Sequence, residues 1–223
     1  MRANRTRRPY IVLNAAMSLD GKIATSTGDS QMSSPEDLRR VHRLRASVDG
    51  IMVGFRTLMV DDPKLTVKHV RGPNPTRVIV DSNAGTPLDS YVVKTAKDIR
   101  TIIAVTARAP KKRIEALQRK GATVLICGEG PLVSLKTLLN LLGRLGLQKI
   151  LLEGGGTLNW NMLRNGLVDE VSVAITPRIL GGTEAVSLVA GEGVRLVRDS
   201  VKLKLLGASR YGPDLVVRYR VIA

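Results

Sequence analysis

The alternation of apolar and polar positions predicts short buried strands that alternate with helices. Apolar runs of strand length occur at 10–16, 49–54, 77–82, 101–106, 123–127 and 150–152. Apolar residues at helical spacing occur at 34–48, 110–120, 134–145 and 158–167. Strands that alternate with helices favour a largely parallel sheet with helices on both faces.

The pattern changes after the helix that is expected to end near Gly166. Strand-like stretches at 169–176, 201–208 and 215–222 follow without a helix between them, which predicts an antiparallel edge. The expected fold class is therefore α/β, with a mixed, mostly parallel sheet flanked by helices and with antiparallel C-terminal strands. No composition break marks a linker, so we expect one domain over 1–223, with a flexible basic tail at 1–8.

One helix start is visible at Ser34, which is expected to be the cap. Pro35 would take the first helical position, and an acidic residue, Asp37, follows three residues after the cap. The positions that predict its buried stripe are Leu38, Val41, Leu44 and Val48. No carboxylate or cysteine is fixed beside His42 by spacing, so we expect a surface or half-buried residue rather than a catalyst, and we expect Arg45 to be solvated.

The charge balance is the main compositional signal. The chain has 35 Lys and Arg against 19 Asp and Glu, a net charge of +16. Such an excess suits either nucleic acid or anionic small molecules that are drawn to a basic surface. Aromatic residues make up only 3% of the chain, so platforms for stacking single-stranded bases are nearly absent. We therefore expect no nucleic-acid partner, with a basic nucleic-acid-binding protein as the minority alternative.

Two further classes are disfavoured by the sequence. No apolar run approaches the roughly 18 residues that a bilayer requires, and the run at 11–13 is too short for a signal-peptide core. A cytoplasmic protein without a membrane partner is expected. The single cysteine excludes an internal disulfide, and two histidines offer no cluster for zinc.

The stretch 150–170 carries the clearest chemical signal. A short buried strand ends at Glu153, and Gly154, Gly155 and Gly156 lead directly into a helix. Unshielded N–H groups at a helix N-terminus suit a phosphate. The spacing is not that of the G-x-G-x-x-G dinucleotide motif. The alternative to a phosphate site is a purely structural strand-to-helix turn, with the carboxylate of Glu153 at its start.

Six short motifs occur in a specific order along the chain. They are Ser18-Leu19-Asp20-Gly21-Lys22, Val53-Gly54 with Thr57, Asp61-Asp62-Pro63-x-Leu65-Thr66, Asp81-Ser82, Glu153-Gly154-Gly155 and Pro177-x-x-Leu180-Gly181-Gly182. Each motif is weak alone, but the ordered set resembles the pyrimidine reductases of riboflavin biosynthesis, and most closely their archaeal branch. The resemblance covers essentially the whole chain.

The resemblance implies a dihydrofolate-reductase-like fold, a homodimer and NADPH as the hydride donor. The implied substrate is a phosphorylated ribosylaminopyrimidine, whose ribosylamino group becomes ribitylamino when C1′ of the ribose accepts a hydride. A cofactor that brings the reactive hydride leaves the protein to align it and to exclude water. This agrees with the lack of a triad or a metal motif in the sequence.

The resemblance also implies site residues, position by position. The stretch that cradles the cofactor pyrophosphate matches Gly154, Gly155, Gly156, Thr157, Leu158 and Asn159. Other cofactor positions match Thr57, Asp61 and Ser82, with Ser82 near the phosphate on the adenosine ribose, and Ala16 and Met32 on the nicotinamide side. Substrate positions match Ser30, Arg45, Leu65, Lys68 and Glu153.

The sequence departs from the bacterial members in two ways. The H-x-E and P-C-x-x-C signature of their zinc deaminase domain is absent, so no deaminase activity is expected. Position 14 is lysine in the bacterial pattern and is Asn14 here. This fits the archaeal and fungal route, in which reduction precedes deamination.

The general acid is not identified by the sequence. Glu153 and Asp20 are the candidates, although Asp20-Gly21 is equally typical of a structural turn. Dihydrofolate reductase itself, on the same fold, is the alternative enzyme. The cations Arg45 and Lys68 suit a ribose 5-phosphate through charge-assisted hydrogen bonds and favour the pyrimidine substrate.

Overall fold

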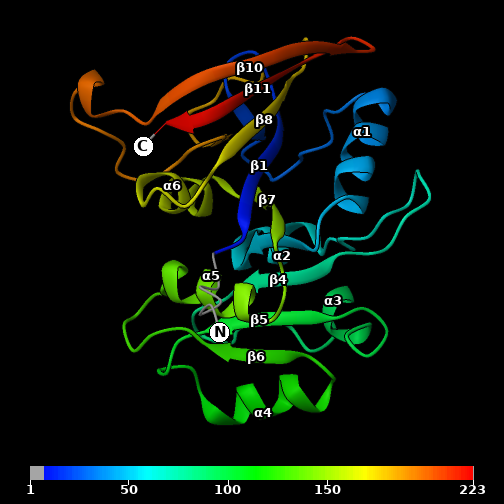
Figure 1. Cartoon of the computed structure of the whole chain (residues 1–223), viewed down its shortest axis with the longest axis vertical. Coiled ribbons are helices and arrows are strands. Elements are labelled where there is room, and N and C mark those ends of the chain that lie inside the picture. The colour runs from blue at the N-terminus through cyan, green and yellow to red at the C-terminus, as the bar shows by residue number, and fades with distance from the viewer. Residues whose placement is uncertain (1–7, 223) are drawn as a thin grey trace, which may run out of the picture. The chain divides into compact units, whose positions relative to one another are not determined.

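The computed structural model describes residues 8–222 (Figure 1). The basic tail expected at 1–8 lies outside the described residues apart from Arg8. The chain packs into two compact units, each assembled from segments that are distant in sequence. Unit 1 comprises Met1–Tyr10, Val48–Thr66 and Asn74–Ile150, and unit 2 comprises Ile11–Ser47, Val67–Pro73 and Leu151–Ala223. The single domain expected over 1–223 stays a prediction.

Unit 1 is built on four parallel strands in the order β3-β4-β5-β6. These strands are β3 (Gly50–Gly54), β4 (Thr76–Val80), β5 (Thr101–Val105) and β6 (Thr123–Ile126). The helices of the unit are α2 (Phe55–Asp61), α3 (Tyr91–Lys94), α4 (Lys111–Arg119) and α5 (Leu135–Arg144). The residues at helical spacing predicted α4 and α5.

Strands β3, β4 and β5 of the unit 1 sheet are buried on both faces, as the near-continuous apolar runs predict. Alternate residues such as Ile79 and Ile103 join one core cluster, to which α2 contributes Leu58 and α4 contributes Leu117. The intervening residues, such as Val78, are equally buried. The buried side of α5 consists of Leu138, Leu139 and Leu142.

Unit 2 contains the antiparallel strands that the C-terminal pattern predicts (Figure 1). Its strands are β1 (Tyr10–Met17), β8 (Glu170–Ile175), β11 (Asp214–Ile222) and β10 (Lys202–Tyr211). β1 pairs with β8 in parallel, β8 with β11 antiparallel, and β11 with β10 antiparallel. The expected fold class is therefore confirmed: a mixed, mostly parallel sheet with helices and antiparallel C-terminal strands.

The remaining elements of unit 2 carry most of the candidate residues. They are β2 (Lys22–Ala24), α1 (Pro35–Ala46), α6 (Gly156–Arg164), β9 (Val186–Ser187) and the 3-10 turn Val197–Asp199. β7 (Lys149–Gly154) begins in unit 1 and ends in unit 2. β2 and β9 form a separate two-stranded sheet, and β9 and the 3-10 turn were not predicted. Within residues 8–222, no helix is long and apolar enough to cross a bilayer.

The start of α1 is as predicted, but its buried side is not. Ser34 caps the helix by accepting the N–H of Asp37 at 3.2 Å. Val48, just after the helix, is buried as predicted, but Leu38 is 40% exposed and Val41 and Leu44 are only half-buried, so the predicted apolar stripe is wrong within α1. The buried residues of this helix are Asp37, Arg40 and His42.

The polar side of α1 is buried because the neighbouring strands offer polar partners. Arg40 donates to Asn14 Oδ1 on β1 at 3.1 Å and to Ser172 Oγ on β8 at 3.2 Å. Asn14 and Ser172 are register partners, so both lie at one level of the sheet. Arg40 also binds Asp37 Oδ1 at 2.6 Å in a buried ion pair, whereas Asp37 Oδ2 is buried and has no hydrogen-bond partner among the described residues. Hydrophobic spacing could not identify this network.

Candidate functional site

The glycine turn joins β7 to α6 with a backbone that only glycine adopts easily. Gly154 has φ +77° and Gly155 has φ +63°, both in the left-handed region. Gly155 is the N-cap of α6, and no side chain caps that helix. A Cβ on Gly156 would lie 2.5 Å from the carbonyl oxygen of Ser187. The turn therefore leaves helix N–H groups without a side-chain acceptor, as a phosphate site requires.

Asn159, which is buried in the first turns of α6, faces the same turn. Its Nδ2 donates to the carbonyl oxygen of Leu188 at 2.8 Å, which fixes the orientation of the amide. A Cβ on Gly154 would lie 2.5 Å from Asn159 Oδ1. That oxygen is buried and has no hydrogen-bond partner among the described residues. An orphaned acceptor beside the glycine turn fits a ligand that brings a donor, such as a ribose hydroxyl.

Glu153, the residue before the turn, forms a two-pronged ion pair with Arg45 of α1. Arg45 Nε lies 2.8 Å from Glu153 Oε1, and Arg45 Nη2 lies 2.7 Å from Glu153 Oε2. The side chains are 18% and 13% exposed, so the expectation that Arg45 is solvated is wrong. Burial alone would lower the pKa of Arg45, but the charge and hydrogen bonds of Glu153 outweigh it and raise that pKa. Arg45 thus fixes the Glu153 carboxylate.

His42 lies one turn before Arg45 and is buried, so the expected surface or half-buried position is wrong. Its Nδ1 accepts the backbone N–H of Lys68 at 3.1 Å. Its ring meets the His69 ring edge to face, with 4.6 Å between centroids. Burial, and then the charges of Arg45, His69 and Lys68, lower the pKa of His42 to about 4, although Glu153 opposes the shift. His42 is neutral at neutral pH.

The other carboxylate candidate, Asp20, lies in a turn that its own side chain closes. Its oxygens accept the N–H groups of Leu180 at 3.0 Å and of Gly181 at 2.7 Å. Hydrogen bonds from the Ser18 side chain and from these two amides lower the pKa of Asp20 to about 2. The carboxylate is ionised at neutral pH and holds no proton that it could donate.

The remaining candidates of unit 2 lie on β1 and on the loop before α1. Ala16 is half-buried on β1, on the same side of the strand as Asn14. Met32 is 6% exposed, and its N–H donates to the carbonyl oxygen of Ser30 at 2.9 Å. Ser30 itself is exposed.

Comparison with known proteins places this chain in a family. The model of the RibD C-terminal domain matches residues 9–217. The 2,5-diamino-6-ribosylamino-4(3H)-pyrimidinone 5′-phosphate reductase of Methanothermobacter thermautotrophicus is 49% identical over 217 residues, which cover 96% of this chain and 99% of that protein. The chain belongs to the RibD C-terminal domain family. The resemblance to riboflavin-biosynthesis reductases is thereby confirmed.

Solved structures share the fold of this RibD C-terminal domain. RibD of Acinetobacter baumannii has a TM-score of 0.83 at 25% identity, over 96% of this chain and 58% of that chain. The riboflavin biosynthesis reductase Rib7 of Saccharomyces cerevisiae has a TM-score of 0.76 at 23% identity, over 100% of this chain and 93% of that chain. The present chain thus spans little more than half of RibD and nearly all of Rib7.

Unit 1 of this RibD C-terminal domain carries the other cofactor candidates. Thr57 lies in the first turn of α2, and Asp61 ends that helix. Ser82 follows β4, where its Oγ accepts the N–H of Val133 at 3.1 Å. Its carbonyl oxygen accepts the N–H of Thr106 at 3.1 Å and the Thr106 hydroxyl at 3.0 Å. Ser82 therefore ties together the loops that follow β4, β5 and β6.

Leu65, the substrate candidate of unit 1, has an unusual backbone. It is 2% exposed and has φ +51°, in the left-handed region that is costly for a residue with a Cβ. Such strain is typical of positions that a functional site over-determines. The sequence motif located Leu65 but could not show its conformation.

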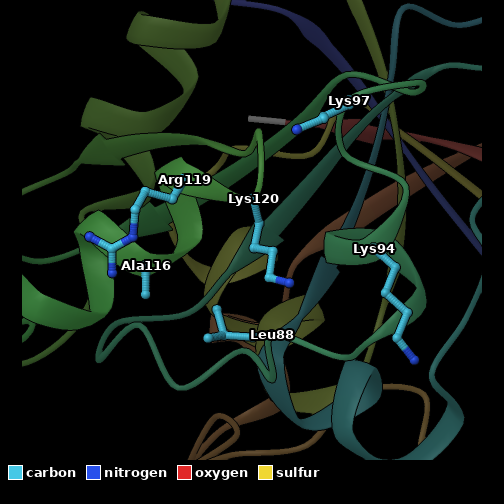
Figure 2. A pocket seen from close by; sticks show the side chains of 6 residues that line it. All are labelled: Leu88, Lys94, Lys97, Ala116, Arg119 and Lys120. Carbon is cyan, nitrogen blue, oxygen red and sulfur yellow. The ribbon is translucent and has the colours of Figure 1, made fainter.

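A cationic hollow lies elsewhere in unit 1 (Figure 2). It is lined by Leu88, Lys94, Lys97, Ala116, Arg119 and Lys120. Its cations lie at the ends of α3 and α4 and on the connections that run from these helices to the amino ends of β5 and β6, whereas ligands of such sheets bind at the carboxyl ends. The side chains of Lys94 and Arg119 extend to opposite sides in Figure 2. These cations complement the helix dipoles rather than converge on a ligand.

Proposed function

We propose that this protein reduces 2,5-diamino-6-(ribosylamino)-4(3H)-pyrimidinone 5′-phosphate with NADPH. The observation that carries the proposal is the glycine turn at Gly154 and Gly155, with the orphaned Asn159 Oδ1 on one side and the ion-paired Glu153 on the other. The 49% identity to a reductase of that substrate, over almost the whole of both chains, supports it.

The cofactor fits the turn on grounds that do not depend on the relatives. The N-terminus of α6 offers N–H groups to a pyrophosphate, and Asn159 Oδ1 offers an acceptor to a hydroxyl of the nucleotide. We assign the residues 154–159 to this part of the cofactor, Ser82 to the phosphate on the adenosine ribose, and Ala16 and Met32 to the nicotinamide side. Thr57 and Asp61 are also assigned to the cofactor. When bound, the nicotinamide supplies the hydride.

The remaining chemistry belongs to the substrate and to the residues around it. The cyclic glycosylamine opens to an imine, in which the bond from C1′ to the ring oxygen has broken. C1′ then accepts a hydride, and the nitrogen gains a proton, so that one NADPH and one proton are consumed for each ribitylamino product. Glu153, held by Arg45, would accept hydrogen bonds from the amino groups or the hydroxyls of the substrate. Lys68 would bind the 5′-phosphate.

Asp20 is not suited to provide the proton. Its low pKa leaves it ionised, and its oxygens already accept two backbone N–H groups. We therefore assign Asp20 to the turn that it closes. Of the two candidates for the general acid, this assignment leaves Glu153, beside water and the substrate hydroxyls.

The decisive experiment measures NADPH oxidation with the phosphorylated ribosylaminopyrimidine and identifies the product by mass spectrometry. A mass gain of one hydride and one proton is expected. Parallel assays with NADH and with dihydrofolate address the cofactor preference and the alternative enzyme. Turnover of dihydrofolate without turnover of the pyrimidine would refute the proposal. Retention on duplex DNA that survives moderate salt would favour the nucleic-acid alternative.

A pair of glycine variants tests the place of the pyrophosphate. Gly155 and Gly166 both have φ +63°, and a Cβ on Gly166 would meet nothing within 4 Å. Gly155→Ala and Gly166→Ala therefore both place alanine at a positive φ, but only the first adds a methyl group at the turn. We expect weaker NADPH binding for Gly155→Ala alone, measured by fluorescence titration. Equal affinities of the two variants for NADPH would contradict the assignment of the pyrophosphate to this turn.

We also propose a homodimer, on the evidence of the exposed apolar residues at the β10 edge of unit 2. Leu203 and Leu205 on β10 are 44% and 56% exposed, and Leu215 and Ile222 on β11 are 45% and 47% exposed. A long, exposed, apolar edge strand favours pairing with another chain. Light scattering after gel filtration measures the mass, and a monomer across the working concentration range would contradict the proposal.

A further inference from the structure

The segment Val67–Pro73 belongs to unit 2, although the segments on both sides of it belong to unit 1. It contains no helix or strand, so its place in unit 2 depends on individual contacts. Two of these contacts are with α1. The Lys68 N–H donates to His42 Nδ1 at 3.1 Å, and a Cβ on Gly72 would lie 2.5 Å from Ala46 Cβ.

The two contact points share one side of α1. His42 and Ala46 are four residues apart and are therefore neighbours on the helix surface. Arg45, which holds Glu153, lies on the adjoining turn. The segment thus runs along the part of α1 that also orients Glu153, and it carries the exposed side chains of Lys68 and His69.

His42 provides a polar tie between α1 and this segment, and its side chain is buried. The tie requires an unprotonated Nδ1, because a backbone N–H can donate only to a free lone pair. The lowered pKa of His42 keeps that lone pair available at neutral pH. The edge-to-face contact with His69 restrains rotation of the ring.

We propose that His42 is a positioning residue, whose neutral imidazole holds the backbone of Lys68 so that the Lys68 ammonium group meets the substrate phosphate. This inference rests on the proposed function, since it takes the phosphate to bind at Lys68. Arg45 and Lys68 are the two cations assigned to the substrate. Arg45 is already engaged by Glu153, which leaves Lys68 for a phosphate. Holding the segment in advance removes part of the ordering cost at binding.

The first test needs no substrate and follows the amide of Lys68 by hydrogen exchange. In the wild-type protein the amide is protected by its bond to His42. His42→Ala removes the acceptor, so exchange should accelerate by about tenfold or more, the factor that corresponds to about 1.4 kcal/mol. His42→Gln, whose carboxamide oxygen can accept the same N–H, should restore part of the protection. Equal exchange rates in the three proteins would overturn the inference, whatever the enzyme does.

The second test separates positioning from general support of the fold. His42→Ala should raise the KM for the pyrimidine substrate by about tenfold, because a displaced binding group loses much of its effect. The affinity for NADPH and kcat should be nearly unchanged, and His42→Gln should recover part of the KM. Arg43→Ala, an exposed cation on the same helix, is the matched control and should change none of these values.

A double mutant distinguishes the two proposals. If His42 acts through Lys68, His42→Ala in a Lys68→Ala background should add almost nothing to the KM. An unchanged KM in Lys68→Ala alone would refute the phosphate placement and this inference with it, while leaving the reductase activity in place. A raised KM in Lys68→Ala but not in His42→Ala would refute the positioning role only. A joint fall in kcat, NADPH affinity and melting temperature for His42→Ala would show mere structural support.

Discussion

The helices α1 and α5 each pack one side against a sheet, but they bury opposite kinds of side chain. The buried side of α5 in unit 1 consists of three leucines, and hydrophobic spacing predicts it without difficulty. The buried side of α1 in unit 2 consists of Asp37, Arg40 and His42. Its leucines, Leu38 and Leu44, are exposed or half-buried. A buried apolar side of a helix stabilises the fold, whereas a buried polar side also orients the groups that its side chains bind.

The difference follows the distribution of candidate chemistry. In α1, Arg40 holds Asn14 and Ser172, Arg45 holds Glu153, and His42 holds Lys68. Arg40, Arg45 and His42 of α1 therefore each contact a group on another element, whereas Asp37 pairs with Arg40 of the same helix. The buried side chains of α5 are leucines, which neither donate nor accept hydrogen bonds. The two helices can be compared directly by substitution.

The largest effect is expected from Arg40→Ala. The change leaves Asp37 buried and unpaired, and it removes the donors to Asn14 and Ser172. Breaking a buried pair by removing one partner costs about 4 kcal/mol. Urea unfolding measures the loss, and a second change, Asp37→Ala, should recover part of it because the uncompensated charge is then gone. A loss below about 1 kcal/mol would show that the network is not closed in solution.

The next effect is expected from Leu142→Ala on α5. Leu142 is fully buried, and removing such a side chain costs about 3 kcal/mol through lost transfer energy and the cavity left behind. The same unfolding experiment applies, and the KM for the pyrimidine should stay as in the wild-type enzyme. A raised KM at wild-type stability would contradict the purely structural role that the comparison gives to α5.

The same contrast explains how much of the molecule the sequence could predict. Strands such as β4 and β5 and helices such as α5 follow from hydrophobic periodicity alone, because both unit 1 sheet faces are apolar. The glycine turn could likewise be predicted, because three consecutive glycines between a strand and a helix indicate a tight turn. The buried side of α1 could not be predicted, because the residues that bind its polar side chains lie far away in the sequence. Asn14, Ser172 and Lys68 are brought to it only by the fold.

The role of His42 shows the limit most clearly. The two histidines of the chain, His42 and His69, are 27 positions apart, and nothing in this spacing indicates that their rings are in contact. The one available signal was the motif-based assignment of Lys68 to the substrate, next to His69. Conversely, Asn159 was included as part of a stretch, but its orphaned oxygen appears only in three dimensions.

A smaller effect is expected from the titration of His42. Its pKa of about 4 in the folded protein lies below the ordinary 6.5, so the unfolded chain binds more protons between these values. Stability should therefore fall as the pH falls from about 6.5 to about 4, by roughly 2 kcal/mol. The groups that face the ring are Arg45, Lys68, His69 and Glu153.

The matched variant for this titration is His42→Gln, which keeps an acceptor but cannot be protonated. Urea unfolding at a series of pH values should give a shallower loss for His42→Gln than for the wild-type protein over this window. Parallel curves for the two proteins would mean that His42 is protonated as easily in the folded state as in the unfolded one. The polar side of α1 would then be more open to water than its burial indicates.

The smallest effect is expected from Leu38→Gln, and it separates the two ways of assigning the buried side of α1. Hydrophobic spacing places Leu38 in the core, where a polar replacement would cost several kcal/mol. The structure leaves Leu38 40% exposed, so the change should lie within about 0.5 kcal/mol of the wild-type free energy of unfolding. Leu139→Gln on α5, where the leucine is 1% exposed, is the matched control and should be strongly destabilising. A large loss of unfolding free energy for both variants would show that the apolar side of α1 is buried instead. Arg40 and His42 would then not contact the partners described above.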